Sequence, residues 1–305
     1  VICNPIEKVE YVKQITDDAR AETLKQEWKL KQMELQDKEN RKFAAKFEPR
    51  RKSSGEPRSG PSQLEYENRV YNLLEGGTGM PKIYDFFQTK NGDYNVLVMD
   101  RLGSSIQHVL DHTSLKKLQI DSVLAVGMRV LCHLEIIHEK GMLHRDLKPQ
   151  NLMLGRGQDR EVYLIDFGLS KRYAIDGKHI PYKDKKHGLT GTPRFASINS
   201  HLGVEQSRRD DLESLAYVLI YLAKGTLPWV GLGGRKRVRS DDKKANRHER
   251  ILRVKQATTD KKLTQGLPKG MLHFLRKIRS LKFYDRPPYD ELYNMLNRSY
   301  NESLK

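Results

Sequence analysis

The spacing of apolar and polar residues predicts strands and helices from about residue 43 onward. Residues alternate over Phe43–Phe47, as is typical of a strand, and the apolar run Asn95–Met99 is typical of a buried strand. Between them, Ser62 and Glu65 have the spacing of a capping box that opens a helix, and Gly76-Gly77 ends it.

The rest of the chain is dominated by helical periodicity. We predict a long helix from about Ser122 to Glu139, which stops at Gly141. A second helix is predicted to start near Asp211, because leucines then recur on one face, at Leu212, Leu215, Leu219 and Leu222. The predicted class is α+β, with a small lobe that contains strands followed by a larger, mainly helical lobe.

Residues 1–40 allow two interpretations. In the first, Glu7–Ile15 and Trp28–Leu35 are degenerate strands, and Thr16–Gln26 is the loop between them. In the second, Thr16 caps a single charged helix that runs to about Asp37. We favour the helix, because strand-forming residues are scarce there and no Pro or Gly occurs between positions 6 and 48.

Composition narrows the class of protein. A chain of 305 residues can bury a sizeable core, and its two cysteines, Cys3 and Cys132, do not make a disulfide framework. No apolar run is long enough to span a bilayer, and the start does not resemble a signal peptide. We therefore expect a protein of the cytoplasm, the nucleus or both, without a membrane partner.

The net charge of +17 predicts an anionic partner. Nucleic acid, acidic membranes and acidic or phosphorylated peptides are all such partners, and charge alone does not choose among them, although nothing in the chain resembles a zinc finger or an RNA-binding repeat. The basic run Arg235–Arg239 could be a nuclear-import or nucleic-acid patch, although a solvated loop is the commoner explanation for such a run.

Two motifs predict phosphoryl transfer from ATP to a hydroxyl group. Residues 144–151 read His-Arg-Asp-Leu-Lys-Pro-Gln-Asn, and Asp166-Phe167-Gly168 follows. The chemistry needs a carboxylate to orient the nucleophile, a cation on the migrating phosphate and oxygen ligands for magnesium. A polar loop without function rarely has this string and this spacing.

A lysine and a glutamate upstream are predicted to pair. Lys46 lies in the first predicted strand, and Glu67 lies on the inward face of the following helix, where an unpaired carboxylate is costly. An ion pair between them removes that cost, and it would hold the ammonium group over the α- and β-phosphates of the nucleotide.

The predicted nucleotide site also includes an adenine pocket. Met99 ends the buried strand, and Asp100 and Leu102 lie in an extended connector whose backbone groups could contact the adenine edge. Met153 and Ile165 are expected to be its apolar walls.

Beyond these motifs, the chain resembles the casein kinase I family of eukaryotic protein kinases. The resemblance rests on Leu189–Asn199, which contains Ser-Ile-Asn where most kinases have Ala-Pro-Glu, and on His201–Leu215. Gly76–Pro81 and Gly92–Met99 match as well, and the resemblance covers about residues 41–297. It implies a two-lobed protein kinase fold with a small antiparallel sheet, a divergent segment 1–40, an N-lobe at 41–102 and a C-lobe at 103–305.

The resemblance also implies a role for each motif residue. Asp146 would orient the substrate hydroxyl and accept its proton, and Lys148 would stabilise the transferring phosphoryl group. Asn151 and Asp166 would bind magnesium, and Asp211 would anchor the catalytic loop through its backbone.

The resemblance to the casein kinase I family further implies a substrate preference, which is for Ser or Thr downstream of an acidic or already phosphorylated residue. Cations are expected to bind that anion, because guanidinium groups suit phosphate oxygens; the candidates are Arg145, Lys171, Lys186, Arg194 and Arg247. The expected protein is a monomeric serine/threonine kinase that uses ATP and Mg²⁺.

One departure from the family pattern leaves a second function open. The Gly-rich turn that covers the phosphates normally precedes the strand lysine, yet the first glycine of this chain is Gly55, which follows Lys46. Without glycine N–H groups near the phosphates, nucleotide binding should suffer. The alternative is therefore a catalytically weak or inactive kinase-like scaffold.

Overall fold

The computed structural model describes residues 43–305 except 53, 55, 185–187 and 232–246, and these residues form two compact units. The small unit comprises the residues up to Gly76, Met80–Gly103 and Gly155–Asp159. The large unit comprises Gly77–Gly79, Ser104–Leu154 and Arg160–Lys305. The three-stranded sheet lies in the small unit, and the large unit consists mainly of helices. The predicted α+β class is therefore confirmed.

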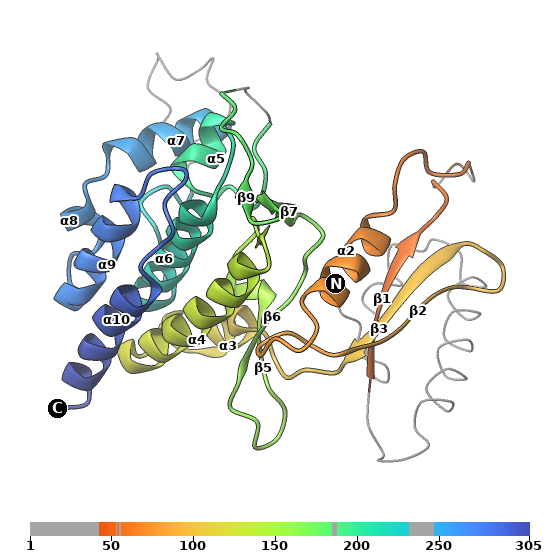
Figure 1. Ribbon diagram of the computed structural model, residues 1–305. Coiled ribbons are helices and arrows are strands. Elements are labelled where there is room, and N and C mark those ends of the chain that lie inside the picture. Colours follow the sequence, from red (N-terminus) through yellow and green to blue (C-terminus); the bar gives the residue numbers. More distant parts are fainter. Residues whose placement is uncertain (1–42, 53, 55, 185–187, 232–246) are drawn as a thin grey trace. The chain divides into compact units, whose positions relative to one another are not determined.

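The small unit contains a three-stranded antiparallel sheet in the order β1-β3-β2 (Figure 1). The strands are β1 (Phe43–Pro49), β2 (Ile83–Gln88) and β3 (Tyr94–Asp100), so both strands predicted from the sequence are present. β1 and β3 are paired so that Lys46 lies opposite Leu97. Because neighbouring residues of a strand point to opposite faces, Lys46 points away from the face that carries Ala45 and Phe47.

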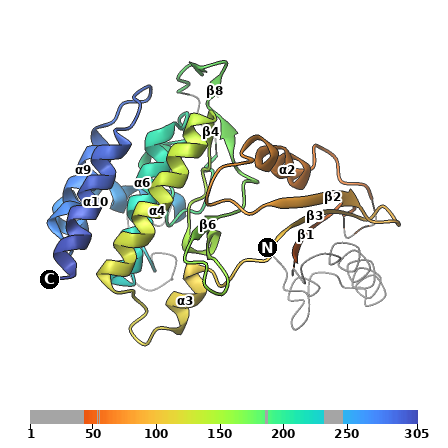
Figure 2. The ribbon, with the colours of Figure 1, turned by 60° about the horizontal axis from the view of Figure 1, so that its bottom comes forward.

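The face of the sheet that carries Ala45 and Phe47 forms a small hydrophobic core. Its buried members are Phe43, Ala45, Tyr94, Val96 and Val98, with the rings of Phe47, Tyr84 and Phe87 packed against them. The other face lies against α2 (Gln63–Leu73), and both ribbon views show this helix along one side of the sheet (Figure 2).

The start of α2 differs from the predicted capping box. The Ser62 hydroxyl accepts a hydrogen bond from the Glu65 amide at 2.9 Å, as predicted, but the Glu65 carboxylate lies near Arg69 instead. Glu48 of β1 takes the second role, and its Oε1 accepts hydrogen bonds from the Gln63 and Leu64 amides at 2.8 and 3.2 Å. The helix is therefore capped by a strand residue far from it in the sequence.

The large unit is built from helices joined by short strand pairs. The helices are α3 (Ile106–His112), α4 (Ile120–Glu139), α5 (Ile198–Leu202), α6 (Arg208–Lys224), α7 (Arg247–Ala257), α8 (Asp260–Leu263), α9 (Lys269–Ser280) and α10 (Tyr289–Ser303). The pairs are β4 (Met142–Leu143) with β7 (Lys171–Arg172), β5 (Leu152–Leu154) with β6 (Val162–Leu164), and β8 (Ala174–Ile175) with β9 (Lys178–His179). A 3₁₀ turn, η2 (Pro149–Asn151), precedes β5.

The helix α6 is the centre of the large unit. It packs against α4 and α9, while α10 packs against α4 and α9, and both views show the four helices side by side (Figures 1 and 2). The four leucines that predicted this helix, Leu212, Leu215, Leu219 and Leu222, are all fully buried. The helix begins at Arg208, earlier than predicted, because Ser207 and Asp210 form a capping box there.

None of the helices in the described part of the chain has the length and apolar character needed to cross a membrane. The two interpretations of residues 1–40 and the basic run Arg235–Arg239 concern parts of the chain outside the described residues.

Candidate active site

The predicted ion pair of the small unit is present. Lys46 Nζ lies 2.7 Å from Glu67 Oε2, which joins β1 to α2. The Glu67 side chain is almost completely buried, whereas that of Lys46 is 18% exposed, so the ammonium group remains accessible to an anion. The pair joins the strand lysine to the helix and so restrains the position of its ammonium group.

The connector after β3 corrects one detail of the predicted adenine pocket. Asp100 still belongs to the sheet, and its amide donates to the Lys82 carbonyl at 3.0 Å. Its carboxylate accepts hydrogen bonds from the Lys82 amide and the Tyr84 hydroxyl, both at 2.8 Å. The prediction is therefore wrong for the Asp100 amide, which is already bonded. Met99 is buried in the sheet, and Leu102 is partly exposed beyond its end.

In the large unit, both carboxylate oxygens of Asp146 are held in place. Oδ2 lies 2.5 Å from Lys148 Nζ. Oδ1 accepts hydrogen bonds from the amide and the hydroxyl of Thr192, at 2.8 and 2.7 Å. Asp146 is only 6% exposed, so these bonds determine which way a reacting group meets the carboxylate.

The first motif is hydrogen-bonded to Ile165, the residue that immediately precedes the second motif. Asn151 Nδ2 donates to the Asp146 carbonyl at 3.0 Å, and the Ile165 amide donates to the Asn151 carbonyl at 3.0 Å. The buried His144 ring bridges them as well, since Nδ1 accepts from the Asp146 amide and Nε2 lies 3.1 Å from the Ile165 carbonyl. A carbonyl only accepts, so Nε2 carries the proton. Asp166 therefore follows directly after a residue bonded to the loop.

Asp211 at the start of α6 anchors this loop, as the resemblance implied. Its carboxylate accepts hydrogen bonds from the amides of His144 and Arg145, each at 2.8 Å, and from His138 Nε2 at 2.9 Å. Burial by itself raises the pKa of Asp211, but the hydrogen bond and charge of His138, with the hydrogen bond from the Arg145 amide, outweigh burial and lower that pKa. The carboxylate is therefore held in its ionised form.

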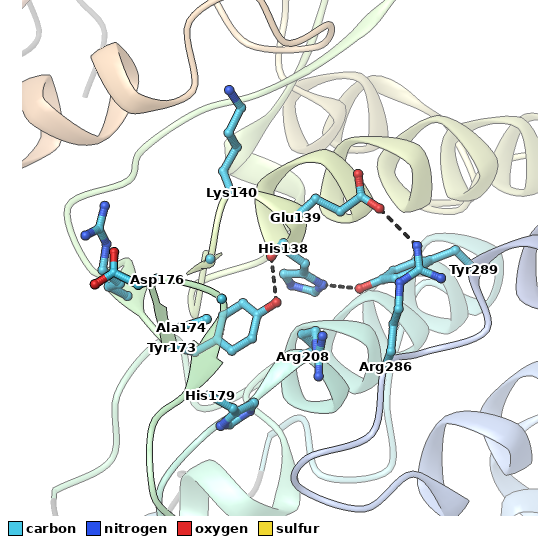
Figure 3. A pocket seen from close by; sticks show the side chains of 13 residues that line it. His138, Glu139, Lys140, Tyr173, Ala174, Asp176, His179, Arg208, Arg286 and Tyr289 are labelled. Carbon is cyan, nitrogen blue, oxygen red and sulfur yellow. Dashed lines mark hydrogen bonds and ion pairs between the residues drawn. The ribbon is translucent and has the colours of Figure 1, made fainter.

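His138 is itself oriented by two tyrosines (Figure 3). The Tyr289 hydroxyl lies 2.6 Å from His138 Nδ1, and the Tyr173 hydroxyl donates to the His138 carbonyl at 2.6 Å. These groups line a cavity of about 370 Å³, whose wall also includes Arg208 and Arg286. In the same view the Lys140 side chain points away from these bonded groups. Through His138, this wall of the cavity is connected to Asp211 and so to the loop that contains Asp146.

Backbone geometry marks the same loop. Arg145 and Asp166 have φ angles of 66° and 70°, a region that side chains rarely adopt, which costs about 1–3 kcal/mol each. Gly191 has φ 93°, and a Cβ there would clash with the Arg145 carbonyl oxygen. A glycine is therefore required for the segment before Thr192 to approach the loop.

The side chains predicted to bind the substrate anion each contact different groups. Arg145 Nε donates to the Leu169 carbonyl at 2.7 Å, and Lys171 lies 2.5 Å from the buried carboxylate of Glu205. Arg194 stacks over the Tyr221 ring at 5.2 Å, and the exposed Arg247 begins α7. A phosphate that binds Lys171 would therefore compete with Glu205. Lys186 lies outside the described residues.

The donors present fit a divalent metal that arrives with a nucleotide. Asn151 binds the loop through its amide nitrogen, which leaves its oxygen as a ligand atom, and Asp166 supplies a carboxylate. Among the described residues, no three His, Cys, Asp or Glu side chains gather into a self-contained metal site. Mg²⁺ bound to a nucleotide typically takes one or two protein oxygens and completes its shell with phosphates and water. Of the predicted adenine walls, Met153 lies in β5 and Ile165 directly follows β6.

The sequence did not single out Thr192 or His144 as members of this site. Thr192 was noted only as part of the family pattern, and its contact with Asp146 spans 46 positions of the chain. His144 was only the first letter of the motif, although its two ring nitrogens connect the motifs. Neither contact has a local signal in the sequence.

Comparison with known families agrees with this geometry. The family model described as the protein kinase domain matches residues 32–296. The matched range contains Lys46, Glu67, Asp146, Asn151 and Asp166.

Proposed function

Because this chain belongs to the protein kinase domain family, we propose that it transfers the γ-phosphate of ATP to serine and threonine residues of proteins. The observation that carries the proposal is the arrangement around Asp146, whose carboxylate is bonded to Lys148 and Thr192 while its carbonyl holds Asn151. The choice of serine and threonine rests on the resemblance to the casein kinase I family.

Each group has a distinct task in this reaction. Asp146 is positioned to accept the proton of the substrate hydroxyl, and Lys148 beside it to stabilise negative charge on the migrating phosphoryl group. Lys46, fixed by Glu67, would bind the α- and β-phosphates. Asn151 and Asp166 would hold Mg²⁺, which when bound neutralises charge on the β- and γ-phosphates.

Acidic or phosphate-primed proteins are the proposed substrates. The net charge of +17 favours such partners, and Arg145, Lys171 and Arg194 belong to the unit that contains Asp146. A peptide with phosphoserine three residues before the acceptor should be preferred over its unphosphorylated form, and Arg194→Ala should remove much of that preference. Equal rates for the two peptides at low salt would exclude this substrate class.

The direct test is radiolabel transfer from Mg²⁺-ATP to casein or an acidic serine peptide. Asp146→Asn removes the proton acceptor and should lower kcat by at least about 100-fold. Asp166→Asn removes a metal ligand and should have a similar effect. Asp290→Asn, the same change at an exposed position of α10, is the matched control and should leave the rate unchanged. Equal transfer by wild type and Asp146→Asn would refute the proposal.

A weak or inactive scaffold is the second candidate, and the absence of any glycine before Gly55 is the observation that favours it. Calorimetric titration of the chain with Mg²⁺-ATP distinguishes the two. Binding accompanied by transfer supports the enzyme, and binding without transfer, or no binding, supports the scaffold. A weakened affinity with normal turnover would mean that the missing glycines affect only the nucleotide.

A further inference from the structure

A lysine with no role in the chemistry above is completely buried in the large unit. Lys255 of α7 is 0% exposed, and lysine is among the residues that are least often fully buried. Its Nζ donates to the Pro193 carbonyl at 3.1 Å and, through a shorter bond, to the Ala196 carbonyl. The ammonium group therefore joins α7 to two carbonyls of the segment that follows Thr192.

Two aromatic rings complete the surroundings of this ammonium group. Nζ lies 4.8 Å from the centre of the Tyr217 ring and 5.0 Å from that of Trp229, which are cation–π distances. The Trp229 indole N–H donates to the Arg194 carbonyl at 2.7 Å. Carbonyls of Pro193, Arg194 and Ala196 are thus bonded by α7 and by the residues packed against it.

Burial makes the charged form of this lysine costly. Burial lowers the pKa of Lys255 to about 7, while the Glu213 carboxylate opposes this shift and the Arg279 guanidinium adds to it. A leucine or methionine could fill the same space without this cost. What an apolar side chain could not do is donate to the Pro193 and Ala196 carbonyls, which would both lose the hydrogen bond from Lys255.

The bonded segment leads directly to Asp146. Thr192, which holds the Asp146 carboxylate, immediately precedes Pro193. On its other side, Gly191 packs tightly against the Arg145 carbonyl. The His201 ring of α5 donates to the same Pro193 carbonyl, at 3.0 Å. The segment is therefore fixed at both ends, against the catalytic loop at Gly191–Thr192 and against α7 at Pro193–Ala196.

We propose that Lys255 is a positioning residue, which holds the segment Gly191–Ala196 on α7 and thereby keeps Thr192 in contact with Asp146. Because this segment borders the carboxylate that would receive the substrate hydroxyl, Lys255 controls use of the protein substrate rather than binding of ATP. This inference rests on the proposed kinase function.

The test compares Lys255→Met, which keeps the length of the side chain but removes its donors, with Lys255→Gln, which keeps an N–H donor without the charge. Lys255→Met should lower kcat/KM for the acidic peptide by about 100-fold, the loss typical of misplaced reacting groups, while the KM for ATP stays within about twofold. Lys255→Gln should recover part of that loss. Lys261→Met, which removes one exposed lysine from α8, is the matched control.

A second readout does not depend on activity. Hydrogen exchange followed by mass spectrometry should show faster exchange of the Phe195 and Ala196 amides, which donate to the Thr192 carbonyl, in Lys255→Met than in Lys261→Met. Peptides from α4 should exchange equally in both. If Lys255→Met does not fold, Lys255→Gln is compared with Lys261→Met in the same way.

The two readouts separate failure of the inference from failure of the proposed function. A folded Lys255 variant with wild-type peptide kinetics and unchanged exchange in this segment would overturn the inference. A wild-type chain that transfers no phosphate would refute the kinase function, and the exchange comparison would then decide alone whether Lys255 holds the segment.

Discussion

Asp146 shows how a single residue depends on partners that are distant in the sequence. Lys148 and Thr192 both donate hydrogen bonds to its side-chain oxygens. Lys148 lies two positions away, whereas Thr192 is 46 positions away. The carboxylate is therefore oriented by the loop and by the later segment together.

We predict that Thr192→Val, which removes the hydroxyl but keeps the shape, lowers kcat by about tenfold to 100-fold, because one hydrogen bond that orients Asp146 is lost. Thr192→Ser keeps the hydroxyl and should retain most of the activity. Steady-state kinetics and the melting temperature of both variants provide the check. A Thr192→Val enzyme as fast as wild type would show that the hydroxyl is not needed for orientation.

His201 is a residue whose pKa is shifted by its surroundings. Burial lowers the pKa of His201 to about 4, the positive charge of Lys255 adds to this, and the hydrogen bond to the Pro193 carbonyl opposes it. The ordinary pKa is 6.5, so between about pH 6.5 and 4 the unfolded chain binds a proton that the folded chain does not. This group therefore favours the folded state least at the acid end of that range.

The expected result is a loss of stability as the pH falls from about 6.5 to 4, part of which should be absent in His201→Gln. Glutamine can donate to the Pro193 carbonyl but does not titrate. Urea unfolding at several pH values measures the effect as a difference between the two chains, which cancels the contributions of other groups. Parallel pH profiles would mean that His201 has the same pKa in both states.

The chemical residues of the site could be predicted from sequence because they lie in short, dense motifs. Asp146, Lys148 and Asn151 occupy one loop, and Glu67 was identified by its position on an apolar helix face. Lys255 could not be found in this way, since a lysine in a helix of mostly charged and polar residues is normally solvated. Its burial depends on how α7 packs against α5, which no local pattern determines.

At the scale of elements, the start of α2 depends on β1. Glu48 Oε1 accepts two amides of the first helical turn, and its other oxygen is bonded to Ser62 and to Asn95 Nδ2. Burial raises the pKa of Glu48, but the hydrogen bonds from Ser62 and Asn95 and those from the Leu64 and Gln63 amides outweigh it, so its pKa is lowered. The carboxylate thus stabilises the helix only while ionised.

Glu48→Ala is therefore expected to lower the melting temperature by roughly 2–6 °C, since a lost cap costs about 1–2 kcal/mol. Glu65→Ala should cost less, although the sequence alone assigns Glu65 to the capping box. The difference should be complete above pH 4.5 and disappear as Glu48 is protonated at lower pH. Thermal scans of both variants measure this, and a larger effect for Glu65→Ala would support the local capping box.

The joint between α5 and α6 explains the Ser-Ile-Asn sequence that distinguishes this chain. The Ser197 hydroxyl and the Asn199 amide both donate to Asp210 Oδ1, at 2.7 and 3.0 Å. Asp210 is also the third residue of the α6 capping box. Ser197 and Asn199 therefore have a structural task, which is to hold the segment after Thr192 against the central helix.

For the whole molecule, we expect the positive charge to influence how acidic substrates approach. A net charge of +17 should draw acidic peptides from a distance, and salt screens such attraction beyond about 8 Å at physiological ionic strength. Raising NaCl from about 50 to 300 mM should lower kcat/KM for an acidic peptide several-fold and change that of a neutral peptide little. Equal salt dependence of the two peptides would assign substrate choice to contacts rather than to the field.

The fold class was predictable because leucine periodicity in α6 and apolar alternation in β1 each fit one kind of element. The boundaries of the helices were less predictable than their existence. The capping box of Ser207 and Asp210, for example, moves the start of α6 to Arg208. Packing between distant segments, as at Glu48 or Lys255, was not accessible from spacing at all.

Asp211 has a further consequence, for the timing of local opening. Its carboxylate covers the amide hydrogens of His144 and Arg145, and it is itself buried between His138 and the loop. These two amides can exchange with solvent only when their hydrogen bonds to Asp211 open. Their exchange rates would therefore report the lifetime of the assembled loop, and would do so in the absence of substrate, nucleotide or turnover.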